Sequence, residues 1–154
     1  MEKMKILGLD MGKARVGVAI SDDEQKLAFP LETIQVLPQI RDSKVLSYVD
    51  DFDLLQRIDE IVSENKISSI VVGLPVSDTG KEKENCTEIR NFAEFLKDEL
   101  GNILIHFEDE RFTTVQAHSQ LHDLGKKPSK SRSIVDQLAA VNILQSWLDK
   151  QLDC

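Results

Sequence analysis

The sequence predicts one α/β domain built on a mixed five-stranded sheet with flanking helices. The chain opens with apolar runs separated by short polar or glycine-containing turns, which is typical of an antiparallel meander. Its middle alternates β-branched runs with amphipathic helical patterns, which is typical of parallel strands joined by crossover helices. A length of 154 residues fits one domain. We expect that domain to span residues 1–150, with residues 151–154 as a C-terminal tail.

The first two strands are the apolar runs at residues 6–9 and 16–20, which are joined by a tight turn. The first run ends in Asp10. Because side chains alternate along a strand, Asp10 shares a face with Ile6 and Gly8. A turn-forming Asp beside glycine is the simpler interpretation. A carboxylate that ends a wholly apolar strand nevertheless needs a positive partner.

The remaining elements follow from composition and periodicity. We expect a third strand at 28–36, an irregular stretch at 37–53 with a short helix near 44–49, and a helix that begins near Asp53 as its cap. Strands at 67–73 and 103–107 are expected on either side of a helix at 81–100, with Gly73 and Gly101 as stop signals. Two further helices are expected, at 113–125 and at 133–149.

Composition narrows the location and the possible partners. No apolar stretch approaches the roughly 18 residues of a membrane span, and no signal peptide is evident, so we expect a cytoplasmic protein. Cys86 and Cys154 form neither a disulfide framework nor a metal pair, and Cys86 fits a core position. A net charge of −8 argues against nucleic-acid binding, but local basic residues at 126–132 still permit an anion site.

Acidic residues end or interrupt apolar elements at three places: Asp10, the 108–110 cluster and Asp136. Asp136 lies near the start of a helix that is apolar on both sides, so we expect this helix to be largely buried. A first-turn Asp that is stabilised by the helix dipole is the alternative interpretation. Ala139 and Ala140 are small enough to let the helix approach the sheet closely, which would bring Asp136 near the strand ends.

These acids predict a metal site. If the first and fifth strands are parallel, Asp10 and either Asp109 or Glu110 meet at the carboxyl edge of the sheet, where ligands bind in such folds. Carboxylates gathered there repel one another unless a cation neutralises them. Oxygen ligands without His or Cys favour Mg²⁺ or Mn²⁺, and such a site suits phosphodiester hydrolysis.

Basic residues flank the acids. Arg15 and Arg111 could hold a substrate phosphate or simply pair with a carboxylate. Lys126, Lys127, Lys130 and Arg132 precede Asp136, and they form either a solvated loop or a grip on a phosphate backbone. We favour the grip because the sequence places these charges beside the acids.

Four stretches resemble one known family, in its order along the chain. They are LDMGKARVGVA at 9–19, VGLP at 72–75, DERFTT at 109–114 and VDQLAAVNILQ at 135–145. Together they resemble the YqgF/RuvX family, which is described as Holliday-junction resolvases and as pre-16S ribosomal RNA nucleases. The stretch at 37–53 looks longer than the link usual in that family.

The resemblance implies a ribonuclease-H-like fold with strand order 3-2-1-4-5 and strand 2 antiparallel. It also implies a metal-dependent nuclease whose acids are Asp10, one of Asp109 and Glu110, and Asp136. The expected partner is nucleic acid, either structured RNA or a DNA junction, and the chain would act as a monomer or homodimer. Processing of pre-16S ribosomal RNA is the first hypothesis and junction resolution the second.

Two other function classes compete with the nuclease. A nucleic-acid-binding module that does not cut would fit the negative net charge. An actin-like or sugar-kinase-like ATPase also begins with a strand, Asp-x-Gly and a hairpin. Such ATPases need two domains of this kind, and this chain has the length of one and lacks a second glycine-rich nucleotide loop.

Overall fold

A five-stranded mixed sheet forms the centre of the molecule, in a computed structural model that describes residues 4–43, 47–75, 85–110 and 132–152. The strand order is β3-β2-β1-β4-β5, as predicted. The strands are β1 (Lys5–Met11), β2 (Arg15–Ser21), β3 (Ala28–Gln35), β4 (Ile67–Leu74) and β5 (Leu104–Asp109). The helices are α1 (Pro38–Arg41), the 3₁₀ turn η1 (Tyr48–Asp50), α2 (Phe52–Glu64), α3 (Cys86–Glu99) and α5 (Arg132–Leu152).

The register places the carboxyl ends of β1, β4 and β5 together. β1 pairs antiparallel with β2, with Asp10 opposite Gly17, and parallel with β4, with Leu9 beside Val72. β5 continues the parallel part, with Leu74 beside Asp109. β4 therefore lies between the two strands that carry acids at their ends.

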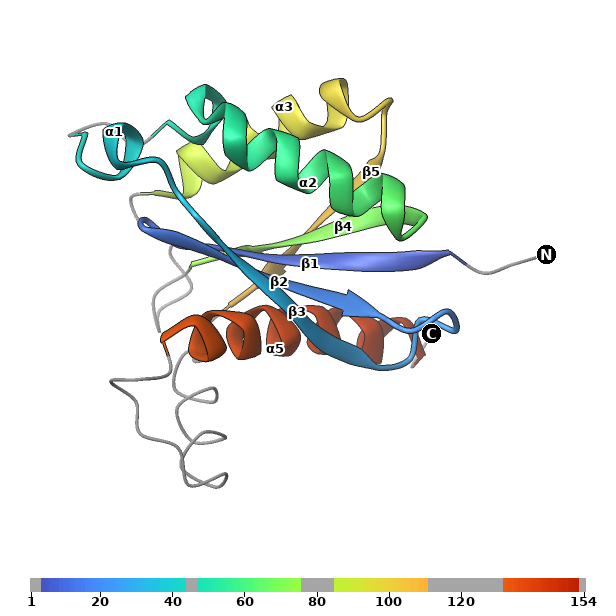
Figure 1. Cartoon of the computed structure of the whole chain (residues 1–154). Coiled ribbons are helices and arrows are strands. Elements are labelled where there is room, and N and C mark those ends of the chain that lie inside the picture. The colour runs from blue at the N-terminus through green and yellow to red at the C-terminus, as the bar shows by residue number, and fades with distance from the viewer. Residues whose placement is uncertain (1–3, 44–46, 76–84, 111–131, 153–154) are drawn as a thin grey trace.

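Helices cover the two faces of the sheet unequally. Among the described elements, α2 and α3 lie on one face and α5 crosses the other, as Figure 1 shows. The larger hydrophobic core lies under α2 and α3 and contains Leu7, Leu9, Val18, Ile70 and Phe92 among others. The smaller core lies under α5 and contains Ile6, Ala19, Val71, Ala140, Ile143, Leu144 and Leu148. The alternation of side chains on β1, with Leu7 and Leu9 on one face and Ile6 on the other, accounts for this division.

The start of α2 differs from the expectation. The predicted cap, Asp53, lies inside the first turn, and Asp51 caps the helix by accepting a hydrogen bond from the backbone N–H of Leu54 at 3.0 Å. The second carboxylate oxygen of Asp51 accepts from the N–H of Leu37 at 2.9 Å. Asp51 is fully buried, so both bonds form away from water, where they are stronger.

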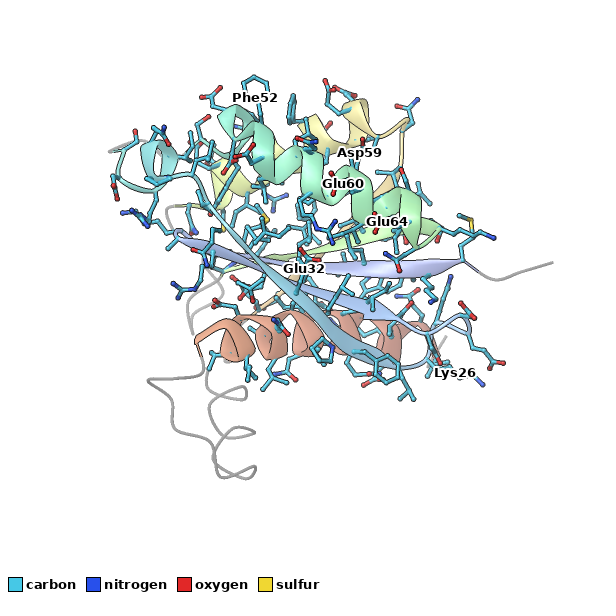
Figure 2. All side chains as sticks on the ribbon, in the orientation of Figure 1. Lys26, Glu32, Phe52, Asp59, Glu60 and Glu64 are labelled. Carbon is cyan, nitrogen blue, oxygen red and sulfur yellow. The ribbon has the colours of Figure 1, made fainter. Side chains whose placement is uncertain are left out.

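Ion pairs fasten α2 to the edge of the sheet. Figure 2 shows Glu32 on β3 below α2, with Asp59, Glu60 and Glu64 on the helix. Arg57 donates to both carboxylate oxygens of Glu32, at 2.7 and 2.9 Å, and to Glu60 at 2.8 Å. These acids therefore belong to the face of the sheet opposite α5.

Other boundaries shift by a few residues. The strand predicted to stop at Gly73 continues to Leu74, and the last helix extends to Leu152 instead of Asp149. The short helix expected near 44–49 falls partly on residues 44–46, which lie outside the described part, and the described residues on either side form α1 and η1. Cys86 is buried, as expected.

The helix predicted at 113–125 also lies outside the described residues. Within the described ranges, no helix has the length and apolar character needed to cross a membrane.

Candidate metal-binding site

Glycines allow α5 to lie close against the sheet. A Cβ atom at Gly8 would lie 2.8 Å from the Cβ of Leu144, and one at Gly17 would collide with the backbone carbonyl of Asp136. Real Cβ atoms do not approach so closely, so any larger residue would push the helix away. The close approach that the small residues Ala139 and Ala140 predicted from the helix side is matched by glycines on the strand side.

This packing brings Asp10 and Asp136 together. Gly17 is the register partner of Asp10 on β2, and the carbonyl of Asp136 sits directly over Gly17. Two segments separated by more than a hundred residues in sequence therefore meet at the end of β1. The charge of Asp136 acts on the Asp10 carboxyl, as expected for neighbouring acids.

Glu110 reaches the same place from β5. Its N–H donates to the carbonyl of Leu74 at 3.1 Å, and its Oε2 atom would lie 2.7 Å from a Cβ at Gly73. The missing side chain at Gly73 thus leaves space for the Glu110 carboxylate to cross β4 toward Asp10, with which it hydrogen-bonds. Asp109 is exposed, as alternation along the strand requires. Of the two acids that the sequence left open, Glu110 lies beside Asp10.

The electrostatics of Asp10 reflect this crowding. Burial is the largest influence and raises the pKa of its carboxyl above the ordinary 3.8. The hydrogen bond with Glu110 acts in the opposite direction and lowers that pKa, while the negative charge of Asp136 raises it again. A carboxyl in such surroundings is stabilised by a nearby positive charge.

Arg15 supplies one positive charge at the edge of the site. Its Nε donates to Oδ2 of Asp136 at 2.7 Å, and the two side chains are 26% and 21% exposed. Because Arg15 and Gly17 lie on the same face of β2, the register that places Gly17 under α5 also directs Arg15 toward it. Of the two roles left open for Arg15, the structure shows the ion pair with a carboxylate.

The described residues contain no group of three His, Cys, Asp or Glu side chains already arranged to hold a metal ion. Asp10 and Glu110 contact each other, while Asp136 is held by Arg15. The donor set is nevertheless all oxygen, which fits Mg²⁺ or Mn²⁺. Arg111, Lys126, Lys127 and Lys130 lie outside the described part of the chain, and the side chain of Arg132 is likewise not described.

Sequence reasoning missed Tyr48 behind the site. This residue is fully buried, and its hydroxyl donates to the carbonyl of Gly12 at 2.8 Å, with the carbonyl of Met11 at 3.3 Å. Burial and then the charges of Asp10 and Glu110 raise the pKa of Tyr48, so the hydroxyl stays protonated and can donate. A single Tyr in an irregular stretch gives no periodic signal that would have identified it.

Glu108, which the resemblance left out of the site, has a separate partner. It is 5% exposed and forms an ion pair with the Nζ of Lys150 on α5. Two residues earlier, His106 stacks on Trp147 with ring centroids 4.7 Å apart. Both contacts fasten the second half of α5 to β5. The other two histidines of the chain, His118 and His122, lie outside the described residues.

Comparison with known proteins identifies the family. A family model described as "RuvX: Holliday junction resolvase" matches residues 4–150, which is nearly the whole chain. The chain belongs to the RuvX family. A RuvX-like relative from Corynebacterium jeikeium, named "Putative pre-16S rRNA nuclease", is 43% identical over 93% of this chain and 84% of its own length. A relative of the same name from Chloroflexus aggregans is 38% identical over 97% of this chain and 96% of its own.

The fold of this RuvX chain is also similar to that of a solved RuvC structure. The Thermus thermophilus RuvC structure in complex with a Holliday junction substrate matches with a TM-score of 0.59 over 97% of this chain and 96% of that one. Identity is 17%, so this likeness concerns the fold alone. It confirms the ribonuclease-H-like architecture that the sequence resemblance implied.

Proposed function

We propose that this RuvX protein is a metal-dependent endonuclease that cuts structured nucleic acid, with precursor 16S ribosomal RNA as its substrate. The observation that carries the proposal is the meeting of Asp10, Glu110 and Asp136 where β1 and β5 end against the start of α5. The names of relatives up to 43% identical over most of the chain support the choice of substrate.

The three acids have distinct surroundings, which suggests distinct roles. Asp10 interacts with both other acids: it hydrogen-bonds with Glu110, and the negative charge of Asp136 raises the pKa of its carboxyl. We propose that Asp10 and Glu110 hold Mg²⁺ or Mn²⁺ and that Asp136 completes the ligand set by exchanging Arg15 for the ion. The bound ion would supply a more acidic water and neutralise charge on the phosphate. Arg15, once released, lies close enough to the site to pair with a substrate phosphate.

The net charge of −8 is compatible with a nucleic-acid substrate. The acids of α2, including Asp59, Glu60 and Glu64, lie on the face of the sheet opposite α5 (Figure 2). The proposed phosphate contacts at Lys126, Lys127, Lys130 and Arg132, with Arg111, come from the segment that leads into α5. A local basic region beside the acids would then act on the substrate despite the overall charge.

The decisive experiment compares the three acids of the candidate site with the exposed acid Asp109, which is adjacent to Glu110. Purified protein is incubated with Mn²⁺ or Mg²⁺ and a precursor 16S RNA fragment, alongside Asp10→Asn, Glu110→Gln and Asp136→Asn variants. Each is expected to lose at least about a hundredfold in cleavage rate, since loss of a ligand exceeds the effect of its supporting residues. Asp109→Asn is the matched control, because Asp109 is exposed, and it should stay within about threefold of the wild type.

The outcomes separate the competing functions. Cleavage that survives in Asp10→Asn, or that persists with excess chelator, would contradict the proposal. Salt-dependent RNA binding without any turnover would favour a module that binds and does not cut. A four-way DNA junction tested in parallel addresses the activity that the family's description names, and faster cleavage of that junction than of RNA would make it the substrate.

A further inference from the structure

The side chain of Tyr48 is enclosed in the larger hydrophobic core. Its ring is fully buried in the larger core and packs against Phe92 of α3, with ring centroids 5.8 Å apart. Phe92 is itself 1% exposed. A side chain enclosed in this way keeps one position, so its hydroxyl group is a fixed point in the molecule.

The backbone that carries Tyr48 is fixed as well. Three residues further on, Asp51 accepts hydrogen bonds from Leu37, at the start of the irregular stretch, and from Leu54, at the start of α2. One buried carboxylate therefore ties both ends of this stretch together. The N–H of Val36 also donates to the carbonyl of Ala14 at 2.9 Å, which attaches the end of β3 to the turn between β1 and β2.

The fixed hydroxyl holds the turn that follows Asp10. It donates to the carbonyl of Gly12 at 2.8 Å and lies 3.3 Å from that of Met11. The N–H of Gly12 in turn donates to the carbonyl of Asp10 at 3.1 Å. The peptide groups directly after Asp10 are thus restrained from the face of the sheet opposite α5.

We propose that Tyr48 is a positioning residue for Asp10, and that η1 and Asp51 hold its hydroxyl under the end of β1. By fixing the Met11–Gly12 backbone, Tyr48 sets the direction in which the Asp10 carboxylate meets Glu110 and Asp136. The inference rests on the proposed nuclease function, and it assigns a task to a stretch that looked longer than the family's usual link.

The test removes one buried hydroxyl group at each end of β1. Tyr48→Phe keeps the buried ring and deletes only the hydroxyl that reaches Gly12. Ser21→Ala is the matched control, because the Ser21 hydroxyl is also buried and accepts from the N–H of Ile6 at 2.8 Å, at the opposite end of the strand. Both variants lose a buried bond to the same strand, so their thermal stabilities should fall by similar amounts.

Cleavage kinetics and backbone hydrogen exchange give the two readouts. Tyr48→Phe is expected to lower kcat by about tenfold or more with KM within about twofold, because small displacements of a reacting group strongly slow catalysis. Ser21→Ala should leave both constants within about twofold. Exchange of the Gly12 amide should accelerate about tenfold in Tyr48→Phe only, and that of the Ile6 amide in Ser21→Ala only.

Each result supports or overturns a specific claim. Equal losses of kcat in the two variants, or a wild-type kcat in Tyr48→Phe, would overturn the positioning role, as would unchanged Gly12 exchange. Hydrogen exchange needs no substrate. If Gly12 loses protection while the wild-type chain cuts neither RNA nor DNA, the proposed function falls and the restraint of the turn by Tyr48 stands.

Discussion

Arg15 and Asp136 lie 121 positions apart in the sequence, yet the Nε of one donates to the Oδ2 of the other at 2.7 Å. This pair links β2 to the first turns of α5. In the proposed mechanism it also has a second consequence, because the carboxylate that Arg15 holds is one that a metal ion must take. Arg15 therefore competes with the ion.

Replacing Arg15 by Gln should strengthen metal binding. A partly exposed ion pair contributes about 1 kcal/mol, which corresponds to roughly fivefold in a dissociation constant. The Kd for Mn²⁺ of Arg15→Gln, measured by titration calorimetry, should fall by about that factor. Arg57→Gln breaks an ion pair with Glu32 on the opposite face and should leave the Kd unchanged. Weaker Mn²⁺ binding in Arg15→Gln would show that Arg15 supports the site instead of competing.

Replacing Asp10 by Asn should stabilise the metal-free protein at neutral pH. Burial raises the pKa of Asp10 above 3.8, so the folded state holds this proton more tightly than the unfolded state does. The resulting contribution to stability is present below pH 3.8 and is lost as the pH rises through the folded pKa. Calorimetry with a chelator should show a Tm a few degrees higher for Asp10→Asn at pH 7 and no advantage at pH 3.

The exposed acid Asp109 provides the control for that experiment. Asp109→Asn should change Tm less than Asp10→Asn at either pH, because Asp109 is exposed and Asp10 is buried. A Tm for Asp10→Asn that lies below the wild type at pH 7 would mean that the Asp10 carboxylate is stabilised in the fold, contrary to the direction of its pKa.

A methyl group at Gly17 should disrupt the contact between β2 and α5. The added carbon would collide with the backbone of Asp136, and backbone cannot rotate away as a side chain can. Gly17→Ala should lose about 1–3 kcal/mol of stability, as overpacking does, together with cleavage activity. Gly101→Asn is the control for cleavage: its φ of +72° also strains an added side chain, but nothing lies within 4 Å of a Cβ there, so only stability should fall. Denaturant unfolding measures both variants.

Loss of Lys150 should destabilise the protein through Glu108. The Glu108 carboxylate is 5% exposed, and Lys150→Met leaves that charge buried beside an apolar side chain. The free energy of unfolding should fall by about 1–3 kcal/mol. This is less than for most broken buried ion pairs, because Lys150 itself is well exposed. The double variant Glu108→Gln/Lys150→Met should recover part of this loss in urea unfolding. Equal losses in the single and double variants would contradict the role of the buried charge.

Much of the fold could be predicted because its central strands are so apolar. Residues 6–9 and 16–20 fall within β1 and β2, and residues 67–73 within β4. A run that is buried on both faces leaves few alternatives to a central strand. The resemblance then supplied the strand order, which periodicity alone does not contain.

The details of the candidate site depended on contacts that are distant in sequence. Gly73 looked like a stop signal, but it lies within β4 and leaves room for the Glu110 carboxylate. Asp51 and Asp53 are equally plausible caps by sequence, and only the second bond to Leu37 distinguishes Asp51. The choice between Asp109 and Glu110 likewise required the strand register.

The helix α5 has a consequence for synthesis of the protein. It packs on the face of the sheet opposite α2 and α3, it carries Asp136, and it follows β5 in the chain. A nascent chain that has not yet exposed this helix lacks the smaller hydrophobic core and one proposed ligand. Under the proposed function, cleavage would therefore begin only after α5 has been translated.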